Sequence, residues 1–293
     1  MRGGFVATLA IAIFLSSCAY HAPGVRKASY AYSRYMKGLL SDRLGSIDDA
    51  VSFYRDAQKL DKESPVLHEQ IGLGFIRLND FKKAASEFEK IAGLSPEDDH
   101  ARYVLALLYV QLNDFKKAAG IYTGLLEKNL QDRTQSIGLR RILSQLYFLD
   151  ADFAAAGRET GEILKISPVD EWALYMTAMI ASEQGRLQEA IEGFKLVLSH
   201  YPDSADAMNS LAYMYAEHEI ELAAALVLAE KALEFEPANA AYLDTAGWLY
   251  FKLGDIDRAY EYLKRASILM FDPVILDHLK KVEQTQKQLE KVK

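Results

Sequence analysis

The sequence predicts an all-α protein, built as a solenoid of repeated helical hairpins. The octapeptide Leu78 to Ala85 returns letter for letter as Leu112 to Ala119, 34 residues later. Small residues recur in the same register through seven consecutive segments, which predicts seven stacked units. No stretch alternates with period two for long enough to indicate a strand. Because a single unit of this size cannot bury its own apolar face, each must pack against its neighbours.

Each segment is expected to form two helices. In residues 65–98, Ile71 and Phe75 belong to a first apolar face with three- and four-residue steps. Asn79-Asp80 then has the composition of a turn, and a second apolar face follows it. Pro96 ends the second helix, because proline cannot continue a helix and disfavours the α conformation in the residue before it. Prolines hold the same register in several other segments, which supports a common hairpin.

Two series of small residues run through the seven segments, and both have a packing reason. Gly, Ala or Ser on facing helices lets the two backbones of a hairpin approach closely, while larger residues fill the space between hairpins. The first series is Gly38, Gly72, Ala106, Ser144, Ala178, Ala212 and Gly247, and the second is Ala50, Ala84, Ala118, Ala156, Ala190, Ala225 and Ala259.

These residues resemble the tetratricopeptide repeat, a family of helix-turn-helix units. In the last segment, Gly247, Tyr250 and Ala259 stand where that motif has a small residue, an aromatic residue and an alanine. The resemblance implies a right-handed superhelical solenoid of about seven units, followed by a capping helix at residues 274–293 with Leu276, Leu279 and Val282 on one face. The units are expected near residues 31–64, 65–98, 99–132, 137–170, 171–204, 205–239 and 240–273.

Three departures from the repeat pattern are visible. The first segment has Arg34 and Lys37 where apolar residues are usual, so it is interpreted as a cap. Four additional residues enter near Arg133–Ser136, and one enters the turn of the sixth segment around Glu217–Glu221.

The first residues predict export and lipid anchoring. A positive start precedes an apolar run from Phe5 to Leu15, which is too short to span a bilayer and indicates a signal peptide at residues 1–17. Leu15 to Cys18 is similar to a bacterial lipobox, which implies acylation of Cys18, for example by palmitate. The alternative is an ordinary signal peptide with an incidental cysteine. Residues 18–30 are then expected to be a lipidated, flexible tether. Ala19 after the cysteine favours the periplasmic face of the outer membrane of a Gram-negative bacterium.

Charge and motifs argue against nucleic acid and against catalysis. The formal net charge of −7 is opposite to the basic surface that nucleic acid requires. No phosphate loop, HExxH or GxSxG pattern occurs, so no enzyme activity, cofactor or metal site is predicted. His68 and His100 are interpreted as surface or groove histidines, since two imidazoles without a third ligand make a poor metal site. Acidic pairs such as Asp98-Asp99 fit helix starts, where carboxylates complement the helix dipole.

The resemblance implies that the first helix of each unit lines a concave groove that binds partners. Both tryptophans of the chain fall in this set, and Trp and Tyr commonly anchor interfaces. The alternative is that the tryptophans pack between adjacent units. The groove positions are Glu69, Leu73, Ile76, His100, Tyr103, Leu107, Val110, Arg141, Gln145, Phe148, Trp172, Tyr175, Met179, Asn209, Tyr213, Asp244, Trp248 and Phe251.

The sequence therefore favours a lipid-anchored, non-catalytic scaffold that binds segments of other envelope proteins. The envelope machines that fit are a pilus or secretion secretin, outer-membrane protein assembly and polysaccharide export. A second hypothesis is an adaptor that regulates peptidoglycan-remodelling enzymes or binds glycan, since stacking aromatic residues also serve sugars. The lysine and asparagine clamp that some family members use for a peptide carboxylate is not evident at the matching positions.

Overall fold

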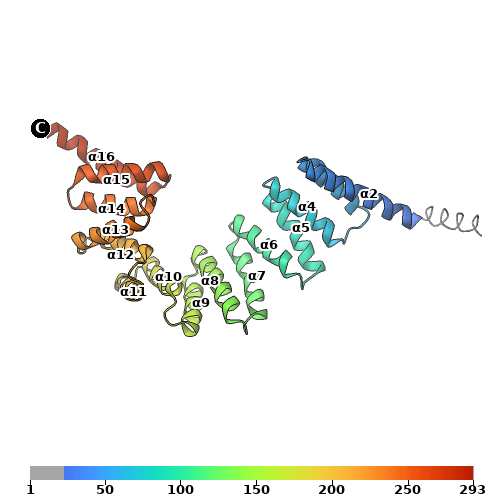
Figure 1. Ribbon diagram of the computed structural model, residues 1–293, viewed down its shortest axis with the longest axis horizontal. Coiled ribbons are helices and arrows are strands. Elements are labelled where there is room, and N and C mark those ends of the chain that lie inside the picture. The colour runs from blue at the N-terminus through green and yellow to red at the C-terminus, as the bar shows by residue number, and fades with distance from the viewer. Residues whose placement is uncertain (1–22, 293) are drawn as a thin grey trace, which may run out of the picture. The chain divides into compact units, whose positions relative to one another are not determined.

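The computed structural model describes residues 23–292, and over this range the chain is entirely helical (Figure 1). Fifteen helices follow one another, and no strand occurs among the described residues. The prediction of an all-α fold is confirmed. The predicted signal peptide and Cys18 lie outside the described residues. Within residues 23–292 no helix combines the length and the apolar character needed to cross a membrane.

The chain divides into two compact parts, residues up to Asp150 and residues from Ala151, and each is described by itself. The N-terminal part contains α2 (Pro23–Arg43), α3 (Ile47–Gln58), α4 (Pro65–Arg77), α5 (Phe81–Leu94), α6 (Asp99–Gln111), α7 (Phe115–Lys128) and α8 (Arg133–Leu149). The C-terminal part contains α9 (Phe153–Ile166), α10 (Glu171–Glu183), α11 (Leu187–His200), α12 (Ala205–Glu217), α13 (Leu222–Phe235), α14 (Ala240–Lys252), α15 (Ile256–Leu269) and α16 (Pro273–Val292). Within each part, successive helices pack side by side, as a solenoid of hairpins requires.

One residue in each hairpin turn has a left-handed backbone. The positive φ angles belong to three glycines and to residues with side chains, and they recur in the repeat register. Glycine and asparagine adopt this conformation at low cost, which explains why one of them stands at this position in five of the seven turns. The added residue of the sixth segment gives its turn two such residues, Glu219 and Glu221. The residues at the shared register position are Gly45, Asn79, Asn113, Ala151, Gly185, Glu219 and Gly254.

Aspartates begin most of the helices. Asp80 and Asp114 are equivalent residues of the exact repeat, and each accepts a hydrogen bond from the backbone N–H three residues later. Asp98 caps α6 in the same way, through Ala101 N at 3.1 Å. These bonds satisfy N–H groups that a helix start leaves without a partner. The interpretation of the acidic turn residues as helix-start residues therefore agrees with the geometry.

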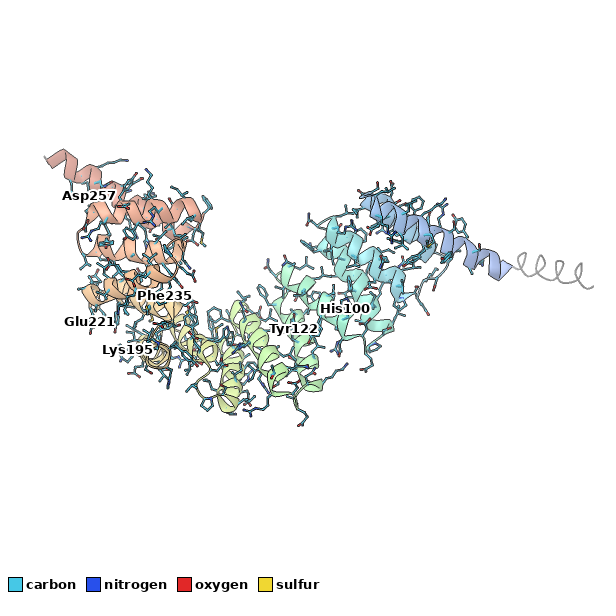
Figure 2. The ribbon with its side chains drawn as sticks, in the orientation of Figure 1. His100, Tyr122, Lys195, Glu221, Phe235 and Asp257 are labelled. Atoms are coloured by element: carbon cyan, nitrogen blue, oxygen red, sulfur yellow. The ribbon has the colours of Figure 1, made fainter. Side chains whose placement is uncertain are left out.

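The core of the N-terminal part is built from the two series of small residues. Ala84, Ala106 and Ala118 are fully buried. A Cβ atom added at Gly72 would lie 2.8 Å from the ring of Phe88, so this ring occupies the space left by the missing side chain. Tyr122, labelled in Figure 2, is buried on α7 and makes an edge-to-face contact with Tyr103 of α6, with ring centroids 6.0 Å apart.

In the C-terminal part, small residues likewise allow close packing of the two helices of a hairpin. This part ends in a helix that covers the last hairpin. A Cβ atom at Gly247 would lie 2.7 Å from Leu263 Cγ, so α14 and α15 are in close backbone contact. Helix α16 packs on α15 and α14. Its residues Ile275 and Val282 are buried, while its outward face is polar. This helix therefore shields an apolar surface that would otherwise face water.

The structure changes the expectation for residues 23–30. These residues were expected to form a flexible tether, but they are the first turns of α2, which runs without a break from Pro23 to Arg43. Proline is well placed at a helix start, because its missing N–H has no partner there in any case. Residues 133–136, an insertion relative to the repeat, likewise form the first turn of α8.

Candidate functional site

The predicted groove residues of the N-terminal part include a row of exposed apolar side chains. Leu73 on α4 and Leu107 on α6 are equivalent residues one repeat apart, 39% and 57% exposed. Tyr103 on α6 is 37% exposed. We call Leu73, Tyr103 and Leu107 the leucine row. Ile76 and Val110, also predicted to line the groove, instead pack partly against the core beneath it.

Polar groups flank this row. Glu69 on α4 and His100 on α6 lie 4.0 Å apart, and the His100 side chain, labelled in Figure 2, is largely exposed. On α8, Gln145 is exposed, whereas Arg141 and Phe148 are half-buried. The leucine row is thus an apolar strip with polar neighbours, an arrangement typical of a protein-binding surface.

In the C-terminal part, the predicted groove residues lie on α10, α12 and α14. Trp172, Tyr175 and Met179 are half-buried on α10, and Asn209 and Tyr213 are half-buried on α12. The ring of Tyr175 packs against Phe194 with centroids 5.6 Å apart, and its hydroxyl lies 3.0 Å from Ser210 Oγ. Phe251 on α14 is half-buried beside Trp248.

Two predicted groove residues are largely covered by the last helix. Asp244 and Trp248 lie on the expected side of α14, but they are only 5% and 6% exposed because α16 covers them. The imidazole of His278 on α16 stacks on the Trp248 indole with centroids 4.1 Å apart. Its Nδ1 also lies 3.0 Å from an Asp244 carboxylate oxygen.

Trp248 is held on its other sides as well. Its indole N–H donates to Glu217 Oε1 at 2.7 Å, and its ring stacks on Phe251 at 5.1 Å. The alternative interpretation, that the tryptophans pack between adjacent units, agrees with these contacts of Trp248 to the preceding unit and to the last helix. For Asp244 and Trp248 the expectation of groove contacts is corrected, because the last helix fills the groove at this point.

A cavity of about 330 Å³ lies between the first helices of the C-terminal part. We call it the C-terminal cavity. Helices α10, α12 and α14 form its walls, and the connection from α15 to α16 closes one side. Four of the predicted groove residues line it, namely Met179, Asn209, Tyr213 and Asp244.

Carboxylates surround the tyrosine of this cavity. Burial raises the pKa of the Tyr213 hydroxyl, and the negative charges of Glu217, Asp244 and Asp272 raise it further. Burial likewise raises the pKa of Tyr175. Both groups are therefore neutral phenols at physiological pH that can donate hydrogen bonds but do not act as bases.

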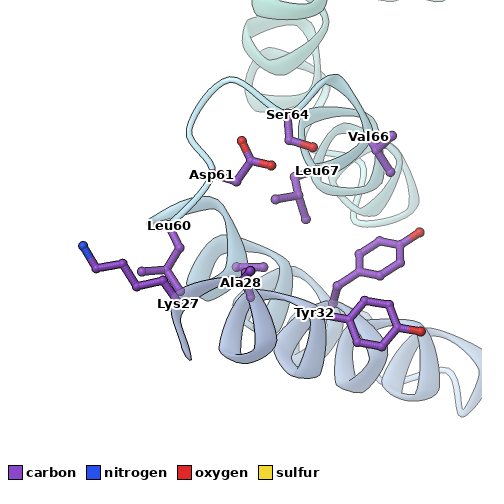
Figure 3. A pocket seen from close by; sticks show the side chains of 11 residues that line it. Lys27, Ala28, Tyr32, Leu60, Asp61, Ser64, Val66 and Leu67 are labelled. Carbon is purple, nitrogen blue, oxygen red and sulfur yellow. The ribbon is translucent and has the colours of Figure 1, made fainter. Parts of the chain in front are cut away.

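A second cavity, of about 490 Å³, lies at the start of the N-terminal part (Figure 3). It is bounded by the first turns of α2, the end of α3 and the start of α4. Its lining is mostly apolar, with Tyr32, Leu60 and Val66 among the residues around it. Sequence reasoning missed this cavity because it treated residues 23–30 as a tether. The signal was the helical spacing of Ala28, Ala31 and Tyr35.

His68 also departs from its interpretation as a surface or groove residue. It is 4% exposed on α4, with Nδ1 2.5 Å from Glu87 Oε2 and Nε2 3.0 Å from the carbonyl oxygen of Lys62. Burial by itself would raise the pKa of Glu87, but hydrogen bonds from His68 and Lys90 bring it below its usual value. This buried cluster ties α4 to α5. Among the described residues, no group of three or more His, Cys, Asp and Glu is arranged to hold a metal ion.

Family models agree with this architecture. Three models described as tetratricopeptide repeat match residues 75–143, residues 172–204, and residues 31–64 with 240–267. Together these matches span more than half of the chain and fall in both parts of the structure.

Individual proteins show the same likeness. A curated TPR repeat-containing protein of Pseudomonas aeruginosa is 30% identical over 142 residues, which are 46% of this chain. The matched segment covers only 24% of the length of that relative.

Among solved structures, a tetratricopeptide repeat protein from Parabacteroides merdae superposes with a TM-score of 0.61 at 18% identity, covering 87% of this chain and 99% of the other. The hetero-tetramer Cut9–Hcn1 of the APC/C gives a TM-score of 0.53 at 16% identity over 89% of this chain and 48% of the other. At these identities the likeness concerns the fold alone.

Proposed function

Because this chain belongs to the tetratricopeptide repeat family, we propose that it is a non-catalytic scaffold that binds a segment of another envelope protein. The observation that supports this most is the leucine row, where equivalent positions of α4 and α6 present large apolar side chains to solvent. Soluble proteins seldom keep such a strip without a partner, because covering it removes apolar surface from water. The partner segment is expected to be extended or helical and to bring apolar residues to this strip.

The test is loss of partner capture by a variant of the leucine row. The double substitution Leu73→Ser, Leu107→Ser is expected to reduce capture of the partner from crosslinked host envelopes by about tenfold or more, since anchor residues of an interface contribute about 1–2 kcal/mol each. Capture is measured by quantitative mass spectrometry with the full-length protein as bait. Circular dichroism checks that the variant keeps its helices.

The matched control is Leu196→Ser, which removes an exposed leucine from α11, the second helix of its hairpin. Control and wild-type chains are expected to capture the same partner equally. Undiminished capture by the double variant would remove the leucine row from the proposal. Enrichment of a secretin, an assembly factor or an export component would support the envelope scaffold. Enrichment of wall hydrolases or glycan fragments would favour the peptidoglycan adaptor instead.

We also propose that Cys18 carries the lipid that anchors the protein to the outer membrane, on its periplasmic face. The support is the sequence, where the only cysteine follows two serines at the end of a short apolar run. Cys18→Ser is expected to move most of the protein from the membrane to the soluble fraction, because each buried methylene of an acyl chain contributes about 0.8 kcal/mol.

Fractionation of host cells followed by immunoblotting measures this shift, with Ser29→Ala as the control. Membrane retention of the serine variant at the wild-type level would refute the anchor. Separating the inner from the outer membrane by density tests the location.

A further inference from the structure

The two parts of the chain differ sharply in charge. Residues 1–150 carry 20 Lys and Arg against 17 Asp and Glu, a formal net charge of +3. Residues 151–293 carry 14 Lys and Arg against 24 Asp and Glu, a formal net charge of −10. The acidity of the whole chain therefore belongs to its C-terminal part. A field of one sign over a concave surface attracts ligands of the opposite charge and raises their local concentration.

This acidity reaches the C-terminal cavity. Glu183 in the last turn of α10, Asp244 on α14 and Asp272 before α16 line it, and no Lys or Arg is among the described residues that do so. Asp244 is already engaged by His278. Asp272 accepts backbone N–H groups at the start of α16 through Oδ1. Glu183 and the second oxygen of Asp272 are left to face a bound group.

An unused hydrogen-bond acceptor lies in the same place. The side-chain oxygen of Asn209 is buried and has no hydrogen-bond partner in the structure. Tyr213, one turn further along α12, lies in the field of three carboxylates. A buried acceptor without a partner is uncommon in native proteins, so it indicates a donor that binds there. A cationic donor would bind this oxygen and would also interact favourably with the carboxylates that line the cavity.

The remaining walls fit the aliphatic part of a basic side chain. Met179, Met214 and Met270 line the cavity together with Phe194. Methionine side chains adapt to varied apolar groups, and lysine and arginine carry long aliphatic stems behind their charge. A volume of about 330 Å³ is at the small end of the range for ligand pockets, which suits one side chain rather than a whole ligand.

The connection beside the cavity presents apolar groups to water. Phe271 is 88% exposed and Ile268 is 76% exposed, next to Met270, which is half-exposed and lines the cavity. Ile268 belongs to the last turn of α15, and Met270 and Phe271 lie between the end of α15 and the start of α16. A partner that brings a cation into the cavity therefore meets an apolar surface beside it.

We propose that the C-terminal cavity binds a lysine or arginine side chain of the partner segment, and that apolar residues next to this cation pack on Phe271 and Ile268. This inference rests on the proposed function, which supplies the segment, and it adds the chemical class that the segment must have. The partner is a basic, amphipathic stretch of another protein.

The experiment compares three acetylated, amidated and labelled peptides that differ at one position, ALKLA, ALQLA and ALELA. Each is titrated with the full-length protein at low salt, and fluorescence anisotropy gives the Kd. The lysine peptide is expected to bind about tenfold more tightly than the glutamate peptide, with the glutamine peptide between them, because only the lysine gains from the carboxylates. Added salt is expected to reduce this preference.

The test variant is Glu183→Gln with Asp272→Asn, which removes two charges and keeps an amide oxygen to cap α16. It is expected to lower the preference for lysine over glutamate to about threefold or less. The control is Glu189→Gln with Glu234→Gln. This control removes the same charge from the exposed surfaces of α11 and α13 and is expected to keep the preference.

Several results would overturn the proposal. They are undetectable binding of the lysine peptide, equal binding of all three peptides, or an equal loss of preference in the control. The leucine row lies in the other part of the chain, so the capture experiment with Leu73→Ser, Leu107→Ser reports on the scaffold function separately. Reduced capture by that variant together with no lysine preference would reject the cation site alone, whereas undiminished capture together with no lysine preference would reject the leucine row as well.

Discussion

Replacing His278 with alanine is expected to lower the free energy of unfolding of the C-terminal part by about 3–5 kcal/mol, or to release α16 from it. The substitution leaves the Asp244 carboxylate buried without its hydrogen-bond partner, and such an unsatisfied group costs about 1–3 kcal/mol, more when it is charged. It also removes the ring that stacks on Trp248. Both losses fall on the contact between α14 and α16.

The measurement is urea unfolding followed by the fluorescence of Trp248, in a chain where Trp172→Phe removes the other tryptophan. Release of α16 exposes the indole, so its emission moves to longer wavelength before the rest of the part unfolds. Limited trypsin digestion supplies a second readout, since Lys280 and Lys281 lie on α16. His100→Ala is the control, because this side chain is exposed on α6. Equal stability and equal emission for the two histidine variants would show that α16 is not held by this pair.

The second large effect is expected from Phe88→Ala, which should lower the free energy of unfolding by about 3–5 kcal/mol. Phe88 is 1% exposed and its ring fills the space above Gly72, where any side chain would collide with it. The alanine would leave a cavity between α4 and α5, and backbone that is already in close contact cannot move in to fill it.

Urea unfolding monitored by far-ultraviolet circular dichroism measures this loss. Because neighbouring repeats can unfold in steps, the first transition is the one to compare. The control is Phe235→Ala on α13, labelled in Figure 2, whose ring is half-exposed. A change below about 0.5 kcal/mol is expected there. Similar losses for the two phenylalanines would contradict the assignment of Phe88 to the core.

The repeat could be predicted from the sequence because the features that define it are local. A 34-residue period, small residues at fixed places and turn residues such as Asn79 each act within one hairpin. These rules were enough to place the helices and the residues buried between them. They failed at the start of the array, where no preceding repeat defines the register. The first turns of α2 were taken for a tether, although Ala28 and Tyr35 have helical spacing.

The candidate site could be predicted only in part. The register assigned Leu73 and Leu107 to equivalent positions of their helices, which depends on the period alone, and both side chains are exposed. Whether a residue on such a face is free depends on what lies over it. Trp248 has the same register position as those leucines but is buried by α16. The sequence predicted a capping helix at residues 274–293, but not that this helix covers Trp248.

The sequence by itself thus determined the fold class, the repeat and its turns, since each follows from periodicity and backbone preference within about 34 residues. Tertiary structure alone decided which groove positions face water, that His68 and His278 are buried partners of carboxylates, and that α10, α12 and α14 enclose a cavity. The physical reason is that burial and pairing arise between residues distant in the chain, and their strength depends on how completely water is excluded around them.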